Sequence, residues 1–203
     1  MVRFSIKKPI VFIIDIDGTM IGDIRPQLML YELHLALKHA NKKINMLNIK
    51  DFEDKLKNGG IVRPYFTKFL KKMKDYLPNV EFFVYTASET VWAKFLINHI
   101  EKALGIKFNR PIFTREDCFY DNQNIKKSLC TITPIVLKHL KKKYGHLKRG
   151  DLENRLLMID NTSGVFDERD KKYVIHCESY DYTHPENIYI TRILYDKYSD
   201  IIN

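Results

Sequence analysis

The sequence predicts an α/β fold in which helices cover both faces of a parallel, doubly wound sheet. Apolar runs rich in β-branched and aromatic residues alternate with helical patterns along the chain, and these runs lack the alternating polar residues of a half-exposed strand. Strands that alternate with helices imply right-handed crossovers and therefore a sheet of this kind. We expect the 203 residues to form one domain, 1–203, with a small insert at about 20–62.

Short apolar runs predict four strands. In chain order they are Pro9–Ile16, Val80–Tyr85, Arg155–Ile159 and Tyr173–Cys177. Between them, apolar residues at intervals of three and four positions predict helices. These helices are Pro64–Asp75, Ser88–Leu104 and Thr133–Tyr144. Gly105 and Gly145 stand where the second and third helices are expected to end, and Val91 is expected on the apolar face of the second.

The insert is expected to be helical as well. Its two helical patterns are Pro26–His39 and Ile49–Lys57. Lys126 and Lys127 lie between the second and third strands in a stretch with neither pattern, which we expect to be irregular.

Composition limits the classes of function. The chain has 34 Lys and Arg against 25 Asp and Glu, and the formal charge of +9 favours anionic partners without choosing among them. Its three cysteines cannot build a disulfide framework, so a reducing compartment is expected. The apolar run Ile10–Ile14 is too short for a membrane span and lacks a signal-peptide pattern. We therefore expect a location inside the cell, in the nucleus or cytoplasm.

Two carboxylates follow the first strand, in the run Asp15-Ile16-Asp17-Gly18-Thr19. At strand periodicity Asp15 and Asp17 would point to the same side and repel each other unless a cation joined them. Mg²⁺ with oxygen ligands would relieve that repulsion. One carboxylate could then attack phosphorus while the other moves a proton, and Gly18 permits the sharp turn that this needs. The alternative is an ordinary turn or helix N-cap made of these residue types.

Polar residues also follow the second and third strands. Thr86, just before a helix, suits a phosphate site, although Thr86 and Glu89 could instead form a capping box. Asp160 and Asn161 could complete a Mg²⁺ site with Asp15, although they could instead form an Asx-turn that enters a helix. Phosphoryl transfer also needs a fixed positive charge. The residues alone do not choose a lysine, and a surface pair is the simpler interpretation of Lys126 and Lys127.

Five motifs in this order resemble the haloacid dehalogenase superfamily of phosphotransferases that use an aspartate nucleophile. More closely, they resemble its small phosphatases that act on the C-terminal domain of RNA polymerase II. The motifs are Arg63-Pro64 with Phe69-Leu70, Tyr85-Thr86-Ala87-Ser88, Arg115-Glu116-Asp117-Cys118, Ile125 to Leu129, and Leu157 to Asn161. The resemblance implies a doubly wound, Rossmann-like sheet and covers about Ile10–Cys177, broken at Met20–Val62.

The resemblance also implies roles for particular residues. Asp15 is the nucleophile and a Mg²⁺ ligand, and Asp17 is the general acid and base, with its backbone carbonyl on the metal. Thr86 and Lys127 hold the phosphoryl group, the lysine being selected by counting nine residues from Cys118. Asn161 is a metal ligand and Asp160 lies beside it.

Three features depart from the family pattern. Gly18 stands where the polymerase-directed phosphatases have Glu, and Ser128 replaces the Asp after the lysine. The family's insert is a small β-element with a pocket that accepts proline, whereas a helical insert is expected here.

These observations predict a Mg²⁺-dependent phosphomonoesterase with an aspartyl-phosphate intermediate, acting on phosphoserine or phosphothreonine in a protein. One alternative keeps the chemistry and changes the substrate to a nucleotide, a polynucleotide end or a phospholipid. The basic stretch Lys138–Arg149 would suit nucleic acid, although it is also typical of a solvated helix end. Another alternative is a binding module on this scaffold without catalysis, which the presence of both Asp15 and Asp17 disfavours.

Overall fold

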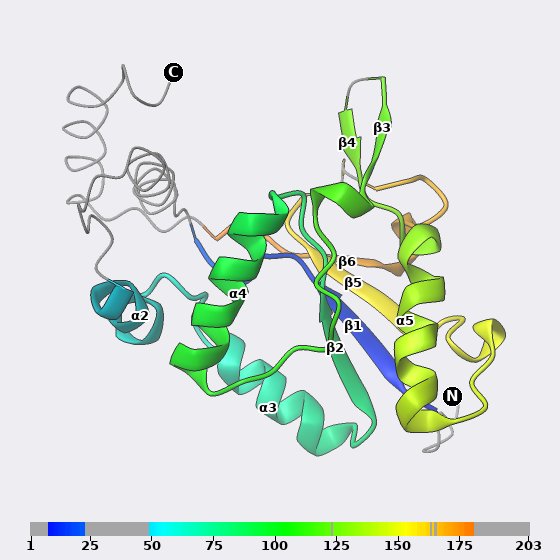
Figure 1. The fold of residues 1–203 in the computed structure, drawn as a ribbon, viewed down its shortest axis with the longest axis horizontal. Coiled ribbons are helices and arrows are strands. Elements are labelled where there is room, and N and C mark those ends of the chain that lie inside the picture. The colour runs from blue at the N-terminus through cyan, green and yellow to red at the C-terminus, as the bar shows by residue number, and fades with distance from the viewer. Residues whose placement is uncertain (1–7, 23–48, 123, 163, 165, 181–203) are drawn as a thin grey trace, which may run out of the picture.

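The computed structural model describes residues 8–22, 49–122, 124–162, 164 and 166–180. The predicted helix Pro26–His39 lies outside these residues. Within them, a sheet of four parallel strands confirms the predicted α/β class (Figure 1). Its strands are β1 (Ile10–Ile14), β2 (Val80–Val84), β5 (Leu156–Asp160) and β6 (Val174–His176), in the order β2-β1-β5-β6. Each overlaps one of the four predicted strands.

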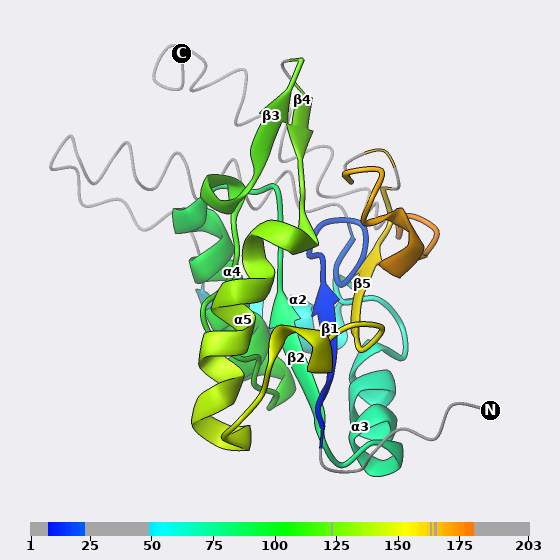
Figure 2. The same ribbon diagram turned by 90° about the vertical axis from the view of Figure 1, so that its right-hand side faces the viewer.

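Helices cover both faces of this sheet (Figure 2). Phe12 and Ile14 of β1 share one buried cluster with helices α3 (Phe66–Tyr76) and α4 (Thr90–Leu104). Val11 and Ile13 share a second cluster with α5 (Leu129–Tyr144) on the opposite face. Successive side chains of a strand point to opposite faces, so an unbroken apolar run fills both cores. Among the described residues, no helix is both long and apolar enough to cross a membrane.

Within the insert the structure describes helix α2 (Ile49–Asn58), which confirms the predicted helix Ile49–Lys57. It lies against α4. Phe52 stacks on Phe95 with ring centroids 5.9 Å apart, and Glu53 accepts a hydrogen bond from Lys102 at 2.9 Å. The described part of the insert therefore shares the core of the sheet.

Three helices begin at residues other than those predicted. α3 begins at Phe66 instead of Pro64. α4 begins at Thr90 instead of Ser88, and Val91 is 60% exposed, so its predicted place on the apolar face is wrong. α5 begins at Leu129, four residues before the predicted start. Asp170 Oδ2 accepts hydrogen bonds from the Leu129 N–H at 2.7 Å and from Ser128 Oγ at 3.1 Å. This carboxylate satisfies the first turn from 41 residues away in sequence.

The stretch expected to be irregular contains a short antiparallel hairpin of β3 (Phe119–Asp121) and β4 (Asn124–Lys126). It projects beyond the carboxyl ends of the sheet strands (Figures 1 and 2). The prediction missed it because its strands have three residues each and are largely exposed, which leaves no apolar periodicity to detect.

Glu101 joins α4 to the segment that follows it. Its side chain is 1% exposed and accepts hydrogen bonds from both terminal nitrogens of Arg110 at 2.8 and 2.9 Å, and from the Phe108 N–H at 2.9 Å. Burial by itself would raise the pKa of Glu101, but these donors and Lys107 outweigh it and hold the pKa below the ordinary 4.5.

We predict that Glu101→Gln lowers the free energy of unfolding by about 1–3 kcal/mol near pH 7, because the charge-assisted hydrogen bonds are lost. The folded pKa lies below the unfolded one, so this contribution is present above the unfolded pKa and is lost as the pH falls through the folded pKa. Urea denaturation at several pH values should show the two proteins converging below about pH 4.5. The exposed Glu153→Gln serves as control, and equal stability of Glu101→Gln and the native chain near pH 7 would contradict the prediction.

Candidate active site

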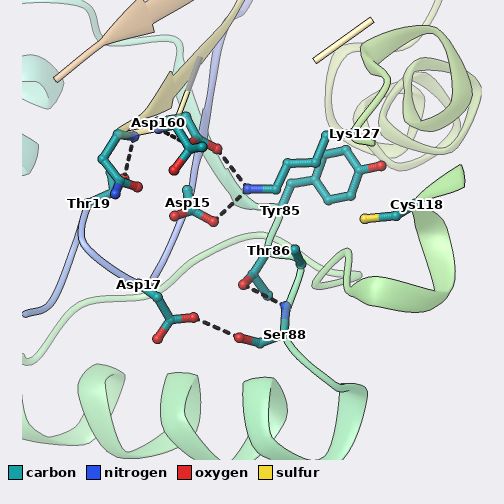
Figure 3. Close-up of polar contacts among 12 residues, drawn as sticks. Asp15, Asp17, Thr19, Tyr85, Thr86, Ser88, Cys118, Lys127 and Asp160 are labelled. Carbon is teal, nitrogen blue, oxygen red and sulfur yellow. Dashed lines mark hydrogen bonds and ion pairs between the residues drawn. The ribbon is translucent and has the colours of Figure 1, made fainter. Parts of the chain in front are cut away.

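The predicted site residues meet at the carboxyl ends of the parallel strands (Figure 3). Asp15 directly follows β1, Thr86 comes two residues after the end of β2, and Asp160 is the last residue of β5. Lys127 directly follows β4 and reaches the same place. Parallel strands end at one edge of a sheet, so residues far apart in sequence converge there.

Lys127 is the centre of this cluster. Its side chain is 3% exposed, and its Nζ lies 2.6 Å from Asp15 Oδ1 and 2.7 Å from Asp160 Oδ2. Lys126 is oriented differently and donates a hydrogen bond to the backbone carbonyl of Gly164. The structure thus brings Lys127, and not Lys126, together with the predicted aspartates.

The cluster holds excess negative charge. Burial raises the pKa of Asp15 to about 7; Lys127 opposes this, while Asp160 and Asp17 add to it. Burial tends to lower the pKa of Lys127, but the two carboxylates outweigh it and raise that pKa. Lys127 therefore stays charged, and one ammonium faces two buried carboxylates.

Asp17 contacts a different partner. Ser88 Oγ donates a hydrogen bond to Asp17 Oδ2 at 2.7 Å, and Figure 3 shows the two side chains directed toward each other. The expectation that Asp15 and Asp17 follow strand periodicity is wrong, because β1 already ends at Ile14. Asp17 instead belongs to the turn, where Gly18 has a φ of +73°. Asp15 and Asp17 thus border the same site, with Lys127 bound to Asp15 and Ser88 bound to Asp17.

Gly18 also lies very close to the residues after β5. A Cβ atom at this position would be 2.4 Å from Nδ2 of Asn161, and the positive φ disfavours any other residue. The departure from glutamate, which the resembling phosphatases have here, therefore fits the local packing of this chain.

Asn161 contacts the turn after β1, whereas Asp160 contacts Thr162 and Lys127. Asn161 Oδ1 accepts a hydrogen bond from Thr19 Oγ1 at 3.0 Å, and the Asn161 N–H donates to the same hydroxyl at 2.9 Å. Asp160 Oδ1 accepts from the Thr162 N–H at 2.7 Å, so the Asx-turn considered from the sequence is present. That turn leaves Asp160 Oδ2 directed at Lys127.

Thr86 is 1% exposed, and its Oγ1 accepts a hydrogen bond from the Ser88 N–H at 3.1 Å. Thr86 and Glu89 do not form the capping box that was the alternative to a phosphate site. Glu89 is the N-cap of α4, and its side chain makes no capping hydrogen bond. Thr86 stands at the strand end, in the turn that leads to the helix, and its hydroxyl can still donate to an anion.

Two residues near the site had no role in the sequence analysis. One is Ser88, the partner of Asp17. The other is Arg63, whose guanidinium donates to the carbonyls of Thr19 at 2.6 Å and of Gly18 at 2.7 Å. It also donates to the carbonyl of Glu178 at 2.6 Å and thereby holds the turn after β1. The Arg63-Pro64 motif marked this residue in the sequence, but only the folded chain places it against the turn.

One observation, the environment of the Asp15 carboxylate, indicates that the site fits a divalent cation. The Asp15 side chain is buried, and its Oδ2 has no hydrogen-bond partner in the described ranges, although Oδ1 is held by Lys127. Asp15, Asp17 and Asp160 outnumber the single lysine, and oxygen donors in a site of excess negative charge suit Mg²⁺. Within the same ranges, no three His, Cys, Asp or Glu side chains gather closely enough to hold a metal by themselves. A cation would therefore need ligands besides these acids.

The fold resembles that of solved phosphatase structures. The structure of Fcp1, an essential RNA polymerase II CTD phosphatase, matches with a TM-score of 0.51 and 17% identity, covering 98% of this chain and 52% of that one. A variant of fission yeast Fcp1 bound to beryllium fluoride matches with a TM-score of 0.49 and 16% identity, over 96% and 53%. A hydrolase from Pseudomonas syringae matches with a TM-score of 0.37 and 17% identity, over 76% of each chain. This chain spans about half the length of the two Fcp1 structures.

A search of curated protein sequences found no match. The model of the NLI interacting factor-like phosphatases matches residues 10–195, which is most of the chain. The match confirms the predicted resemblance to phosphatases of the haloacid dehalogenase type. The chain therefore belongs to the NLI interacting factor-like phosphatase family.

Proposed function

We propose that the chain is a Mg²⁺-dependent phosphomonoesterase that forms an aspartyl phosphate on Asp15. The observation that carries this proposal is the environment of that side chain. Asp15 is buried at the end of β1, Lys127 Nζ holds its Oδ1 at 2.6 Å, and its Oδ2 has no partner among the described residues. A carboxylate that is held at one oxygen and unpartnered at the other is suited to attack phosphorus.

The proposed reaction has two steps. First, an oxygen of Asp15 bonds to phosphorus as the bond from phosphorus to the leaving oxygen breaks, and Asp17 donates a proton to that oxygen. Second, a water oxygen bonds to phosphorus, Asp17 takes the proton of the water, and the bond to Asp15 breaks to release phosphate. The hydrogen bond from Ser88 Oγ supports the orientation of Asp17 between the two steps.

The remaining site residues stabilise charge. Lys127 offsets charge on the phosphoryl oxygens, and the Thr86 hydroxyl donates to one of them. Asp15, the backbone carbonyl of Asp17 and Asn161 would hold Mg²⁺, with Asp160 beside them. When bound, the metal supplies positive charge that offsets charge on the phosphoryl oxygens.

We further propose phosphoserine or phosphothreonine in a protein as the substrate. Membership of the family supports this, and so does the fold shared with Fcp1, an RNA polymerase II CTD phosphatase. The packing of α2 on α4 supports a single phosphatase domain that includes the insert. A location in the nucleus or cytoplasm stays a prediction.

We predict that Asp15→Asn lowers the turnover of an aryl phosphate by about a thousandfold or more, because the nucleophile is lost. Lys127 keeps Asp160 as its partner, so the fold should persist, as circular dichroism can check. Mass spectrometry of acid-quenched native enzyme should find a phosphoryl group on Asp15. The exposed Asp75→Asn is the control, and full activity of the Asp15 variant would remove this residue from the role of nucleophile.

Removal of the metal gives a second test. Chelation with EDTA should stop hydrolysis of the aryl phosphate, and added Mg²⁺ should restore it, because three carboxylates cannot be balanced by one lysine. Calcium, which accepts longer and less regular coordination, should restore less activity. Undiminished turnover in the presence of EDTA would contradict the proposed dependence on a metal.

A pair of lysine variants tests whether Lys127 or Lys126 stabilises the charge of the phosphoryl group. Lys127→Ala should lower aryl phosphate turnover by about a hundredfold or more, because a buried charge beside the reacting group is lost. Lys126→Ala should cost less than about threefold, because the partner of that side chain in the described part of the chain is a backbone carbonyl, that of Gly164. Lys127→Ala also leaves two buried carboxylates unpaired, so the charge-preserving Lys127→Arg provides a folded comparison. The opposite ranking of the two alanine variants would assign the role to Lys126.

A further inference from the structure

A hollow of about 430 Å³ lies between the start of α4 and the β3–β4 hairpin. Its walls include Glu89 and Val91 from the start of α4, Arg115 and Glu116 from the turn before the hairpin, and Tyr120 from β3. We call this hollow the flank groove. None of these side chains has a part in the chemistry proposed above.

The flank groove is built onto the candidate active site. The Arg115 N–H donates to the Ser88 carbonyl at 3.0 Å, and Arg115 Nε donates to the Ala87 carbonyl at 2.8 Å. Its wall is thereby fixed to the loop that carries Thr86. The second strand of the hairpin, β4, ends at Lys126 and is followed directly by Lys127. The residues that line the groove thus connect to the residues proposed to hold the phosphoryl group.

Exposed apolar side chains gather at this place. In the described part of the chain, Val91 is 60% exposed and Tyr120 is 65% exposed. Large apolar groups in contact with water beside a candidate site are typical of a surface that another molecule covers.

The groove is lined by more acidic than basic side chains, whereas the chain as a whole is positively charged. Glu89 has a side chain that is 74% exposed, and Glu116 is also exposed. Arg115 Nη1 lies 3.4 Å from Glu89 Oε1, so the single arginine is shared with a carboxylate. Two acids against one base make the groove locally negative, although the whole chain carries a formal charge of +9.

We propose that the flank groove binds the residues next to the phosphorylated residue of an extended peptide, and that it selects an apolar side chain together with a lysine or arginine. The proposal rests on the function proposed above and names its class of protein substrate. Tyr120 and Val91 supply the apolar contact, and Glu89 and Glu116 attract the cation.

The same charge disfavours the other substrates of this chemistry. A polynucleotide would bring phosphodiesters next to the reacting phosphate, and these would meet Glu89 and Glu116 at close range. A phospholipid surface rich in anionic headgroups would meet the same repulsion. A peptide can carry a cation at that position, so the groove favours a phosphoprotein.

A pair of phosphopeptides tests the selection by charge. The two peptides differ only in lysine or glutamate next to the phosphoserine, and the ratio of their kcat/KM values is measured within each protein, so that a general loss of activity cancels. The native chain should prefer the lysine peptide by about three- to tenfold, less at high salt. Glu116→Lys should bring the ratio to about one or reverse it. Glu153→Lys, an equal change of charge at an exposed site before β5, should leave the ratio unchanged.

A tyrosine pair tests the apolar contact. Tyr120→Ala should weaken binding of a lysine peptide with an adjacent leucine by about three- to tenfold, as measured by fluorescence anisotropy with Asp15→Asn as the background. Tyr76 is 76% exposed at the end of α3 that points away from the hairpin, and Tyr76→Ala should not change the affinity (Figure 2).

The two proposals can fail separately. Hydrolysis of both peptides at equal rates by the native chain, with an unchanged ratio in Glu116→Lys, would overturn the flank groove and leave the phosphatase intact. Binding that depends on Tyr120 and Glu116, without hydrolysis of peptides or aryl phosphate, would support the groove and overturn the proposed catalysis. A 3′-phosphorylated oligonucleotide hydrolysed faster than either peptide would overturn the assignment of a peptide to the groove.

Discussion

The geometry of the site depends on a single buried ammonium group. Lys127 Nζ joins Asp15, at the end of β1, to Asp160, at the end of β5, and so spans two hydrogen-bonded neighbours in the sheet. The attraction within a buried ion pair roughly offsets the free energy needed to remove its charges from water. Stability alone is therefore a weak reason to keep three ionisable groups in a core. The arrangement fits the proposed function, which needs a fixed charge beside the carboxylate of Asp15.

The turn after β1 is held in place by contacts from distant parts of the chain. Arg63 binds the carbonyls of Gly18 and Thr19, while Thr19 exchanges hydrogen bonds with Asn161. Gly18 must be glycine both for its positive φ and for its contact with Asn161. The position of Asp17 is therefore fixed by residues more than forty positions further along the chain, through a turn that is short and tightly constrained.

The parts of the structure that the sequence could predict are those governed by local patterns. Apolar runs predicted the four strands, and the rule that ligands lie beyond their carboxyl ends led directly to Asp15, Thr86 and Asp160. The parts that it could not predict depend on tertiary contacts. α5 begins at Leu129 because Asp170 caps it, and a carboxylate 41 residues away leaves no local signal. The residue pattern by itself does not distinguish Lys126 from Lys127. The family resemblance selected Lys127, and the chain after β4 places Lys127 in the core.

Net charge is a poor guide to the substrate of this chain, because its charges are segregated. The basic stretch Lys138–Arg149 begins in α5, whose first turn adjoins Lys127 and whose axis runs away from the site. A helix of 16 residues is about 24 Å long, so the lysines of its last turn lie far from the reacting groups (Figure 2). One of them, Lys143, is already paired with Glu81 at 2.6 Å. Exposed charges at that distance are largely screened by physiological salt. Close to the phosphate a substrate would therefore meet Lys127, the three aspartates of the site and the acids of the flank groove, which supports the proposed preference for a cation next to the phosphorylated residue.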